Sequence, residues 1–181
     1  MDNSKISELE DAGKKMKLYL LDEKFKDNKL RYAAQSVLAS VVLAFVLLWL
    51  DSFIDFVIIS ALGATTFILF AMPQQSASIP RRVIGGYITG IVVGKTFLFL
   101  LNIIEASIQQ SILVNIFGAI SVGITIFLMT IINTEHPPAV GVSLVIILHG
   151  YEWRTLLLIV VAVILLKLVQ SVLKKWLIDL L

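Results

Sequence analysis

Residues 111–150 read SILVNIFGAISVGITIFLMTIINTEHPPAVGVSLVIILHG, and this stretch decides the fold. Its first part, Ser111–Ile132, is apolar and long enough to cross a bilayer, which takes about 20 residues of α-helix. The polar run Asn133–Pro138 then interrupts it, and the apolar run Ala139–Leu148 is too short for an ordinary span. The pattern predicts a membrane helix, a break, and a short helix that neighbouring helices must shield.

Further apolar runs lie on both sides of this stretch: Tyr32–Leu50, Phe56–Met72, Val83–Ile104 and Leu156–Val172. Hydrophobic residues make up 58% of the chain, against about 45–50% in soluble domains. The bilayer is the solvent that explains so many apolar runs in succession. We therefore predict an all-α polytopic membrane protein with four to six transmembrane helices, and we favour six crossings, one of them the short proline-headed helix.

Residues 1–31 differ from the rest because charged side chains of both signs occur throughout them. They are expected to form a cytoplasmic helix that lies on the membrane surface, or a solvated tail. Residues 32–175 form the predicted transmembrane domain, and residues 176–181 a C-terminal tail. The basic N-terminus predicts a cytoplasmic start for this multi-pass protein of the plasma or inner membrane, and six crossings also place Arg81-Arg82 and Lys174-Lys175 in the cytoplasm.

The polar break has the features of a helix start. A residue before proline avoids the helical region, so His136 is expected to be extended. Pro137 fits the first position of a helix, where its missing N–H costs nothing. The first helical turn presents N–H groups and the positive end of the helix dipole, which together favour an anion. The candidate substrate-binding residues here are Thr134, Glu135, His136, Pro137 and Pro138. A cytoplasmic loop that starts a helix with prolines explains them equally well.

A second predicted helix begins at Pro80 and places Arg81 and Arg82 in its first turn. Cations there oppose the helix dipole, so the stability of the helix does not explain them. They determine topology at the membrane surface, attract an anion, or pair with Glu135. The candidate substrate-binding residues of this start are Arg81, Arg82, Gly85 and Gly86.

The run that follows Pro80 contains a predicted packing face. Glycine recurs there at every fourth residue, at Gly86, Gly90 and Gly94. Such spacing gives one smooth face on a helix and allows a second helix to approach closely.

Two lysines lie inside apolar runs. Lys95 is near the middle of its run, where a charge is costly and is usually buried against a partner or a water-filled cavity. We therefore include Lys95 among the substrate-binding candidates. Lys167 is nearer the end of its run and is expected to extend toward the membrane surface.

Composition argues against several classes of function. A net charge of +2 is too small and too local to indicate a nucleic-acid partner. The chain has no cysteine, which excludes disulfides, thiolate metal sites and cysteine nucleophiles. It lacks a His-x-x-x-His pair and a Gly-x-Ser-x-Gly turn. We expect no catalytic residue, metal ligand or cofactor, and an intramembrane enzyme that uses Glu135 and His136 is the least favoured alternative.

The run Thr134-Glu135-His136-Pro137-Pro138-Ala139, preceded by Pro80-Arg81-x-x-Ile84-Gly85-Gly86, resembles the HPP family of integral membrane proteins. The resemblance covers roughly residues 30 to 175. It implies four transmembrane helices, fewer than the six crossings favoured above. It also implies nitrite transport, the activity associated with members from cyanobacteria and chloroplasts. Tyr87 follows the two glycines where histidine or another polar residue is common in the family, which bears on the substrate more than on the fold.

These observations predict transport of a small monovalent inorganic anion, nitrite by the family resemblance. The helices that start at Pro80 and Pro137 are expected to face each other across a shielded cavity. Their N–H groups, with Arg81 and Lys95, would replace the hydration shell of the anion.

Glu135 and His136 are expected to carry a coupling proton, because histidine titrates near physiological pH. The main alternative is an assembly or regulatory subunit without transport of its own, in which the glycine face would bind a partner. The expected partners are the anion, the lipid bilayer and further copies of the chain in a homo-oligomer.

Overall fold

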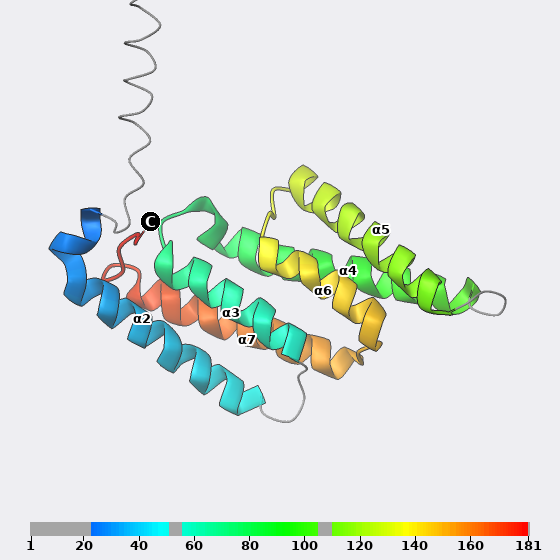
Figure 1. The fold of residues 1–181 in the computed structure, drawn as a ribbon, viewed down its shortest axis with the longest axis horizontal. Coiled ribbons are helices and arrows are strands. Elements are labelled where there is room, and N and C mark those ends of the chain that lie inside the picture. The colour runs from blue at the N-terminus through cyan, green and yellow to red at the C-terminus, as the bar shows by residue number, and fades with distance from the viewer. Residues whose placement is uncertain (1–22, 51–55, 105–109, 181) are drawn as a thin grey trace, which may run out of the picture.

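The computed structural model describes residues 23–50, 56–104 and 110–180, where every regular element is a helix (Figure 1). In chain order they are α2 Glu23–Leu50, α3 Phe56–Ala71, the short 3-10 helix η1 Ser76–Ser78, α4 Pro80–Ile104, α5 Gln110–Ile131, α6 Pro137–His149 and α7 Trp153–Leu173. Among the described residues, α2, α4, α5 and α7 are long and apolar enough to cross a membrane, while α3 and α6 are shorter. The predicted all-α polytopic fold is confirmed. Residues 1–22, most of the predicted N-terminal helix, lie outside the described residues.

Prolines and a glycine mark the helix boundaries. Pro80 is the first residue of α4, and Pro137 and Pro138 are the first two of α6, where their missing N–H groups break no helical hydrogen bond. At the other end of α6, Gly150 adopts the left-handed conformation with φ 65°, and its N–H donates to the carbonyl of Ile146 at 2.9 Å. This is the usual way for glycine to end a helix.

The helices form two groups of three. Helices α2, α3 and α7 pack together, as do α4, α5 and α6, and contacts of α3 with α6 and of α4 with α7 join the groups (Figure 1). Successive helices run in alternate directions. For example, Gln35 near the start of α2 bonds the carbonyl of Phe70 near the end of α3, and Gly86 near the start of α4 lies against His136. This alternation is the arrangement expected for six crossings, with α3 and α6 as the short ones.

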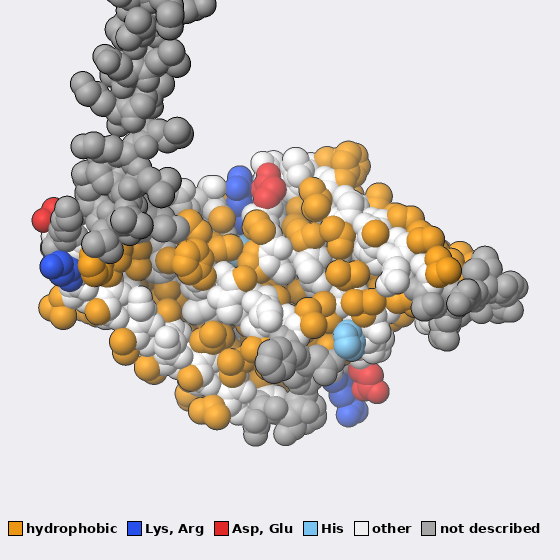
Figure 2. Space-filling view, in the orientation of Figure 1, with side chains coloured by type: hydrophobic (Ala, Val, Ile, Leu, Met, Phe, Trp, Pro, Cys, Tyr) orange, Lys and Arg blue, Asp and Glu red, His pale blue; other side chains and the backbone are white. Residues whose placement is uncertain are grey.

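Apolar side chains fill the interior and also cover the flanks of the helices. Tyr87, Ile146 and Ile159 are fully buried, whereas Phe45 and Phe127 are 70% and 60% exposed. Figure 2 shows hydrophobic side chains spread over the face in view, with charged side chains confined to a few places. Exposed apolar side chains on the flanks suit a hydrocarbon surrounding.

One end of the bundle, which we call the basic end, is where α2, α4 and α6 begin and α3, α5 and α7 finish. It carries Lys29, Arg31, Arg81, Arg82, Lys174 and Lys175. We call the opposite end, with the α6–α7 turn, the far end.

The residues after α7 fold back onto the basic end. Leu177 is buried, and the backbone of Ile178 exchanges hydrogen bonds of 2.9 and 3.2 Å with the side-chain amide of Gln35. The N–H of Leu180 donates to the carbonyl of Ala71 at 2.8 Å. The predicted C-terminal tail is therefore docked on α2 and α3 as far as residue 180.

Candidate functional site

The segment Asn133–His136 joins α5 to α6 at the basic end. Asn133 has a left-handed backbone with φ 54°, which asparagine tolerates better than most residues. The N–H of Thr134 then donates to the carbonyl of Met129 at 2.9 Å. His136 is extended, with φ −136° and ψ 95°, as predicted for a residue before proline. The break therefore lies where the sequence placed it, and Asn133 makes the turn.

His136 is fully buried, and both of its ring nitrogens have protein partners. Nδ1 lies 3.3 Å from the carbonyl oxygen of Ala77 in η1, and Nε2 lies 3.0 Å from Oγ1 of Thr65 in α3. Oγ1 of Thr65 is in turn 2.9 Å from the hydroxyl of Tyr87 in α4. This chain of polar groups, which we call the His136 network, ties α3, η1 and α4 to the segment that precedes α6.

The partners fix the direction of each hydrogen bond. Since a carbonyl only accepts, Nδ1 of His136 is assigned the hydrogen and donates to Ala77. Nε2 then accepts from Thr65, whose oxygen accepts from Tyr87. Burial lowers the pKa of His136, which lies outside the spans, to about 4. Protonation of Nε2 would make this nitrogen a donor to Thr65, and the Thr65 hydroxyl would lose its acceptor. This geometry therefore disfavours the expected role of His136 as a proton carrier.

Glu135 pairs with Arg82 beside the His136 network. Oε2 of Glu135 lies 3.4 Å from Nε of Arg82, and Nη1 of this arginine donates to Ser76 at 3.1 Å. Both facing atoms are cut off from solvent, and neither makes a hydrogen bond within the described residues. The same holds for Oγ1 of Thr134, whose side chain is 6% exposed. Because buried polar atoms normally have partners, these atoms mark a place with spare hydrogen-bonding capacity.

Arg81 points away from that place. Its Nη2 donates to the carbonyl of Ile132 at 2.8 Å, at an exposed position just past the end of α5. A cation there complements the carbonyl groups at the end of a helix. Arg81 and Arg82 therefore have different surroundings, although both belong to the first turn of α4.

The start of α6 differs from the expected anion site. Pro137 and Pro138 carry no N–H, and the N–H of Ala139 already donates to the carbonyl of His136 at 3.0 Å. The N–H groups that we expected in the first turn are thus missing or used at these described positions. The prolines that begin the helix are the physical reason, since each replaces a donor.

The starts of α4 and α6 also lie side by side. A Cβ built on Gly85 would approach Cγ2 of Thr134 to 2.6 Å, and one on Gly86 would approach Cβ of His136 to 2.7 Å. The two helix starts are in direct contact, so they do not face each other across a cavity as expected. In this structure Gly85 and Gly86 pack against the candidate segment.

The glycine face continues along the same contact. A Cβ on Gly90 would collide with the carbonyl oxygen of Ala139, and one on Gly94 would lie 2.9 Å from Cα of Ser143. Helices α4 and α6 therefore run in the same direction with their backbones in contact. The face is used within the chain.

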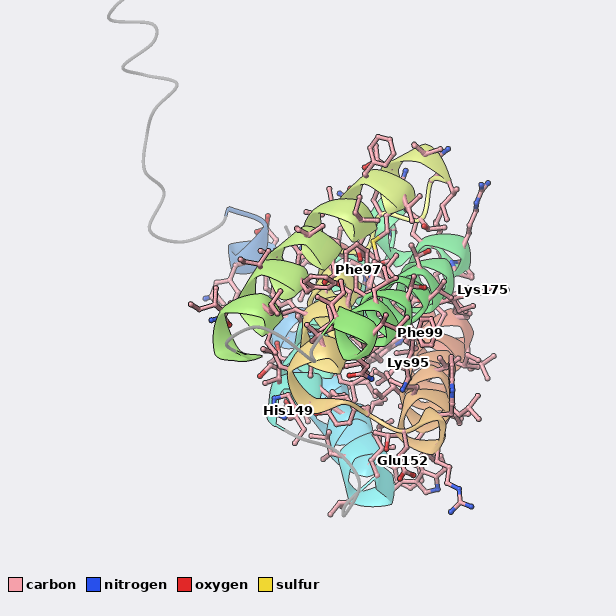
Figure 3. All side chains as sticks on the ribbon, turned by 90° about the vertical axis from the view of Figure 1, so that its right-hand side faces the viewer. Lys95, Phe97, Phe99, His149, Glu152 and Lys175 are labelled. Atoms are coloured by element: carbon pink, nitrogen blue, oxygen red, sulfur yellow. The ribbon has the colours of Figure 1, made fainter. Side chains whose placement is uncertain are left out.

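Lys95 lies apart from these residues, about 22 Å along α4 from Pro80. Its Nζ donates to the carbonyl of Tyr151 and lies 5.3 Å from the ring centroid of Trp153. Figure 3, seen from the right of Figure 1, shows Lys95 on the side of His149 and Glu152. The structure therefore does not bring Lys95 together with Arg81.

Lys167 and its surroundings were not anticipated. Instead of extending to the surface, Lys167 is buried and donates to Oε1 of Gln170, whose Nε2 lies 3.4 Å from the carbonyl of Pro73. The expectation was wrong because the loop after α3 covers this part of α7. The available signal was a polar residue within an apolar run, which also describes Thr65 and Gln35.

Across the described ranges, no three His, Asp or Glu side chains gather in a way that could hold a metal ion. The unpartnered atoms of Arg82, Thr134 and Glu135 and the His136 network are the chemistry-bearing features of the basic end.

Comparisons with known proteins found a similar protein and a matching family. A transmembrane protein of Dictyostelium discoideum is 30% identical over 98 residues, which are 54% of this chain and 32% of that protein. The chain thus spans about a third of the length of this relative. No solved structure matches. The family described as "HPP, transmembrane region" matches residues 26–178, which include the whole candidate site. The chain therefore belongs to the HPP transmembrane family.

Proposed function

We propose that this membrane protein transports a small monovalent inorganic anion, with nitrite as the substrate that the family resemblance suggests. The observation that supports this most is the ion pair of Arg82 and Glu135. Its facing atoms are 3.4 Å apart, shielded from water, and without hydrogen bonds among the described residues. An anion that replaces Glu135 on Arg82 gains charge-assisted hydrogen bonds that the resting pair lacks.

Two neighbouring features support the same position. Thr134 has a buried hydroxyl that can donate to an anion held by Arg82. A cavity of about 380 Å³ lies between α5 and α6, and Glu135 and His136 are among its lining residues. We propose that the anion binds between Arg82 and Thr134 and leaves the basic end through this cavity.

Glu135 is the proposed carrier of a coupling proton, because both ring nitrogens of His136 are engaged with Ala77 and Thr65. A proton that binds the carboxylate removes its charge and releases Arg82. The guanidinium is then available to the anion. One proton and one anion would cross together, with no net movement of charge.

We propose that the basic end faces the cytoplasm. Three short segments bring Lys and Arg residues to it, and such residues accumulate on the cytoplasmic side of membrane proteins. A cytoplasmic N-terminus follows from this orientation, and the proposed location is a plasma or inner membrane. Labelling of a cysteine placed at position 154 from outside intact cells, but not of one at position 174, is the expected result.

Uptake into proteoliposomes tests the proposed transport. Nitrite, nitrate, chloride and formate are compared with and without an inward proton gradient. We expect nitrite uptake that the gradient stimulates. Flux no greater than in empty liposomes under every gradient would contradict the proposal.

Two variants test the roles of the ion pair. Arg82→Gln is expected to lower uptake by about tenfold or more, the effect of losing one charge-assisted interaction. Glu135→Gln mimics the protonated carboxyl and is expected to retain uptake while losing its response to the proton gradient. Arg154→Gln, an exposed charge at the far end, is the matched control and should leave both properties unchanged.

The alternative of a non-transporting assembly subunit rested on the glycine face, which the chain uses for its own α4–α6 contact. We retain the homo-oligomer as part of the proposal, and the mass of the detergent-solubilised protein tests it. A metal analysis of the same preparation tests the enzyme alternative.

A further inference from the structure

A hollow of about 420 Å³ lies between α2 and α3, on the opposite side of the molecule from the α4–α5–α6 group. Small side chains create it: Ser36, Ala39 and Ser40 on α2, and Gly63 on α3. Pockets of about 300–1,000 Å³ hold organic molecules of moderate size. The side chain of Phe67, which also lines the hollow, is 55% exposed, so the hollow opens toward the flank of the bundle.

The wall of this hollow is suited to hydrocarbon. The hydroxyls of Ser36, Ser40 and Thr66 donate to the carbonyls one turn back in their own helices, at 2.9, 3.0 and 2.8 Å. They therefore leave no donor that a polar ligand would have to satisfy. A Cβ built on Gly63 would meet no described atom within 4 Å, which shows that the space in front of this glycine is empty.

The hollow is closed at the basic end. The hydroxyl of Tyr32 donates to the carbonyl of Leu180 at 2.9 Å, and both residues line the hollow. A helix from a second copy has a diameter of about 10–12 Å and would have to run past this closure. A flexible acyl chain that enters the hollow from the flank, beside Tyr32, and runs toward the far end meets no such obstacle.

The closed end is flanked by positive charge. Lys29 lies one turn before Tyr32 and, at helical spacing, on the same face of α2; Lys29 and Arg31 are both exposed. The described acids nearby are Asp27, beyond a kink in α2 at Asn28, and Asp179, which accepts a hydrogen bond from the backbone of Gln74 at 2.9 Å. Basic residues where a span meets the cytoplasmic surface attract anionic headgroups.

We propose that the α2–α3 hollow binds one acyl chain of an anionic phospholipid, whose headgroup lies at Lys29 and Arg31. The site is independent of the ion pair at Arg82, so transport and lipid binding can fail separately.

Native mass spectrometry of the purified full chain in detergent tests this site, with added phosphatidylglycerol, phosphatidylcholine or inorganic phosphate. We expect one retained lipid, with phosphatidylglycerol preferred and no adduct from phosphate alone. Equal retention of the two lipids, or an adduct from phosphate alone, would overturn the assignment to an anionic lipid.

Gly63→Leu fills the hollow, and its matched control is Gly123→Leu. Both glycines are helical, and a Cβ on either meets no described atom within 4 Å, but Gly123 is on α5, away from the hollow. We expect Gly63→Leu to lose the lipid and Gly123→Leu to keep it, with similar melting temperatures for both. Retention of the lipid by Gly63→Leu would contradict the proposal. Loss of a dimer by Gly63→Leu, without loss of a lipid, would also contradict it, because a second copy of the chain would then occupy the hollow.

The headgroup site is tested by Lys29→Gln and Arg31→Gln. Each is expected to weaken the preference for phosphatidylglycerol about fivefold, the usual effect of one basic residue at a membrane surface. Arg154→Gln at the far end is the control. An unchanged preference in both variants would remove Lys29 and Arg31 from the site.

Discussion

The α4–α6 and α2–α3 pairs show two ways in which neighbouring helices pack within one chain. Helices α4 and α6 meet with their backbones in contact, and a Cβ on Gly90 would strike the carbonyl of Ala139. Helices α2 and α3 meet over serine and alanine side chains and leave a hollow of about 420 Å³. Gly63 faces that empty space. Glycine therefore allows close approach in the α4–α6 pair and leaves an empty space in the α2–α3 pair. In the sequence, only the recurrence of glycine at every fourth residue of α4 distinguished the two pairs.

The largest effect is expected where the backbones touch. Gly90→Leu should prevent α6 from packing on α4 and leave little folded protein, because the new side chain meets backbone that cannot move aside. Gly63→Ala should be neutral, or more stable by up to about 1 kcal/mol, since alanine favours helix. Thermal unfolding in detergent measures both. Equal melting temperatures for the two variants would show that the two helix pairs tolerate an added side chain equally well.

The next effect concerns pH and the start of α6. The pKa of His136 is lowered to about 4 in the folded protein, so the unfolded chain binds more protons between pH 6.5 and 4. Stability should therefore be greatest above pH 6.5 and fall on the order of 3 kcal/mol as the pH drops to 4. His136→Asn should lose this part of the pH dependence. A wild type and a variant with parallel pH profiles would contradict the buried, neutral histidine.

A smaller effect is expected inside the His136 network. Thr65→Val keeps the shape of the side chain but leaves Nε2 of His136 and the Tyr87 hydroxyl without their partner, at a cost of about 2 kcal/mol. Thr96→Val is the control, because Thr96 is exposed and bonds only the carbonyl of Val92 in its own helix. Denaturant unfolding compares the two. A larger loss for Thr96→Val would show that the network contributes little.

The smallest effect belongs to the α2–α3 side. Gln35→Leu removes the amide that binds the carbonyl of Phe70 and both backbone groups of Ile178. We expect a loss of about 1 kcal/mol and faster hydrogen exchange in residues 176–180, with α6 unaffected. Exchange that rises in α6 instead would mean that the two helix pairs are coupled.

The sequence predicted the helices well because their apolar runs, prolines and glycines act locally. The extended His136 and the start at Pro137 follow from such local rules. The site was predicted less well, because its partners come from distant segments. Thr65 and His136 are 71 residues apart in the sequence, and the residues next to either one do not predict their contact. The separation of Lys95 from Arg81, in contrast, follows from the rise of a single helix, and their partners lie at opposite ends of it.

The helix α6 has 13 residues and is about 20 Å long, whereas the hydrocarbon layer is about 30 Å thick. A helix of that length that begins at the basic end stops short of the opposite surface unless the bilayer around it is thinner. The first N–H groups of an ordinary helix have no acceptor within the helix, and water usually supplies one. Two prolines and the carbonyl of His136 remove the need for a water acceptor. The His-Pro-Pro tripeptide is thus a way to begin a helix without N–H groups that need water as an acceptor.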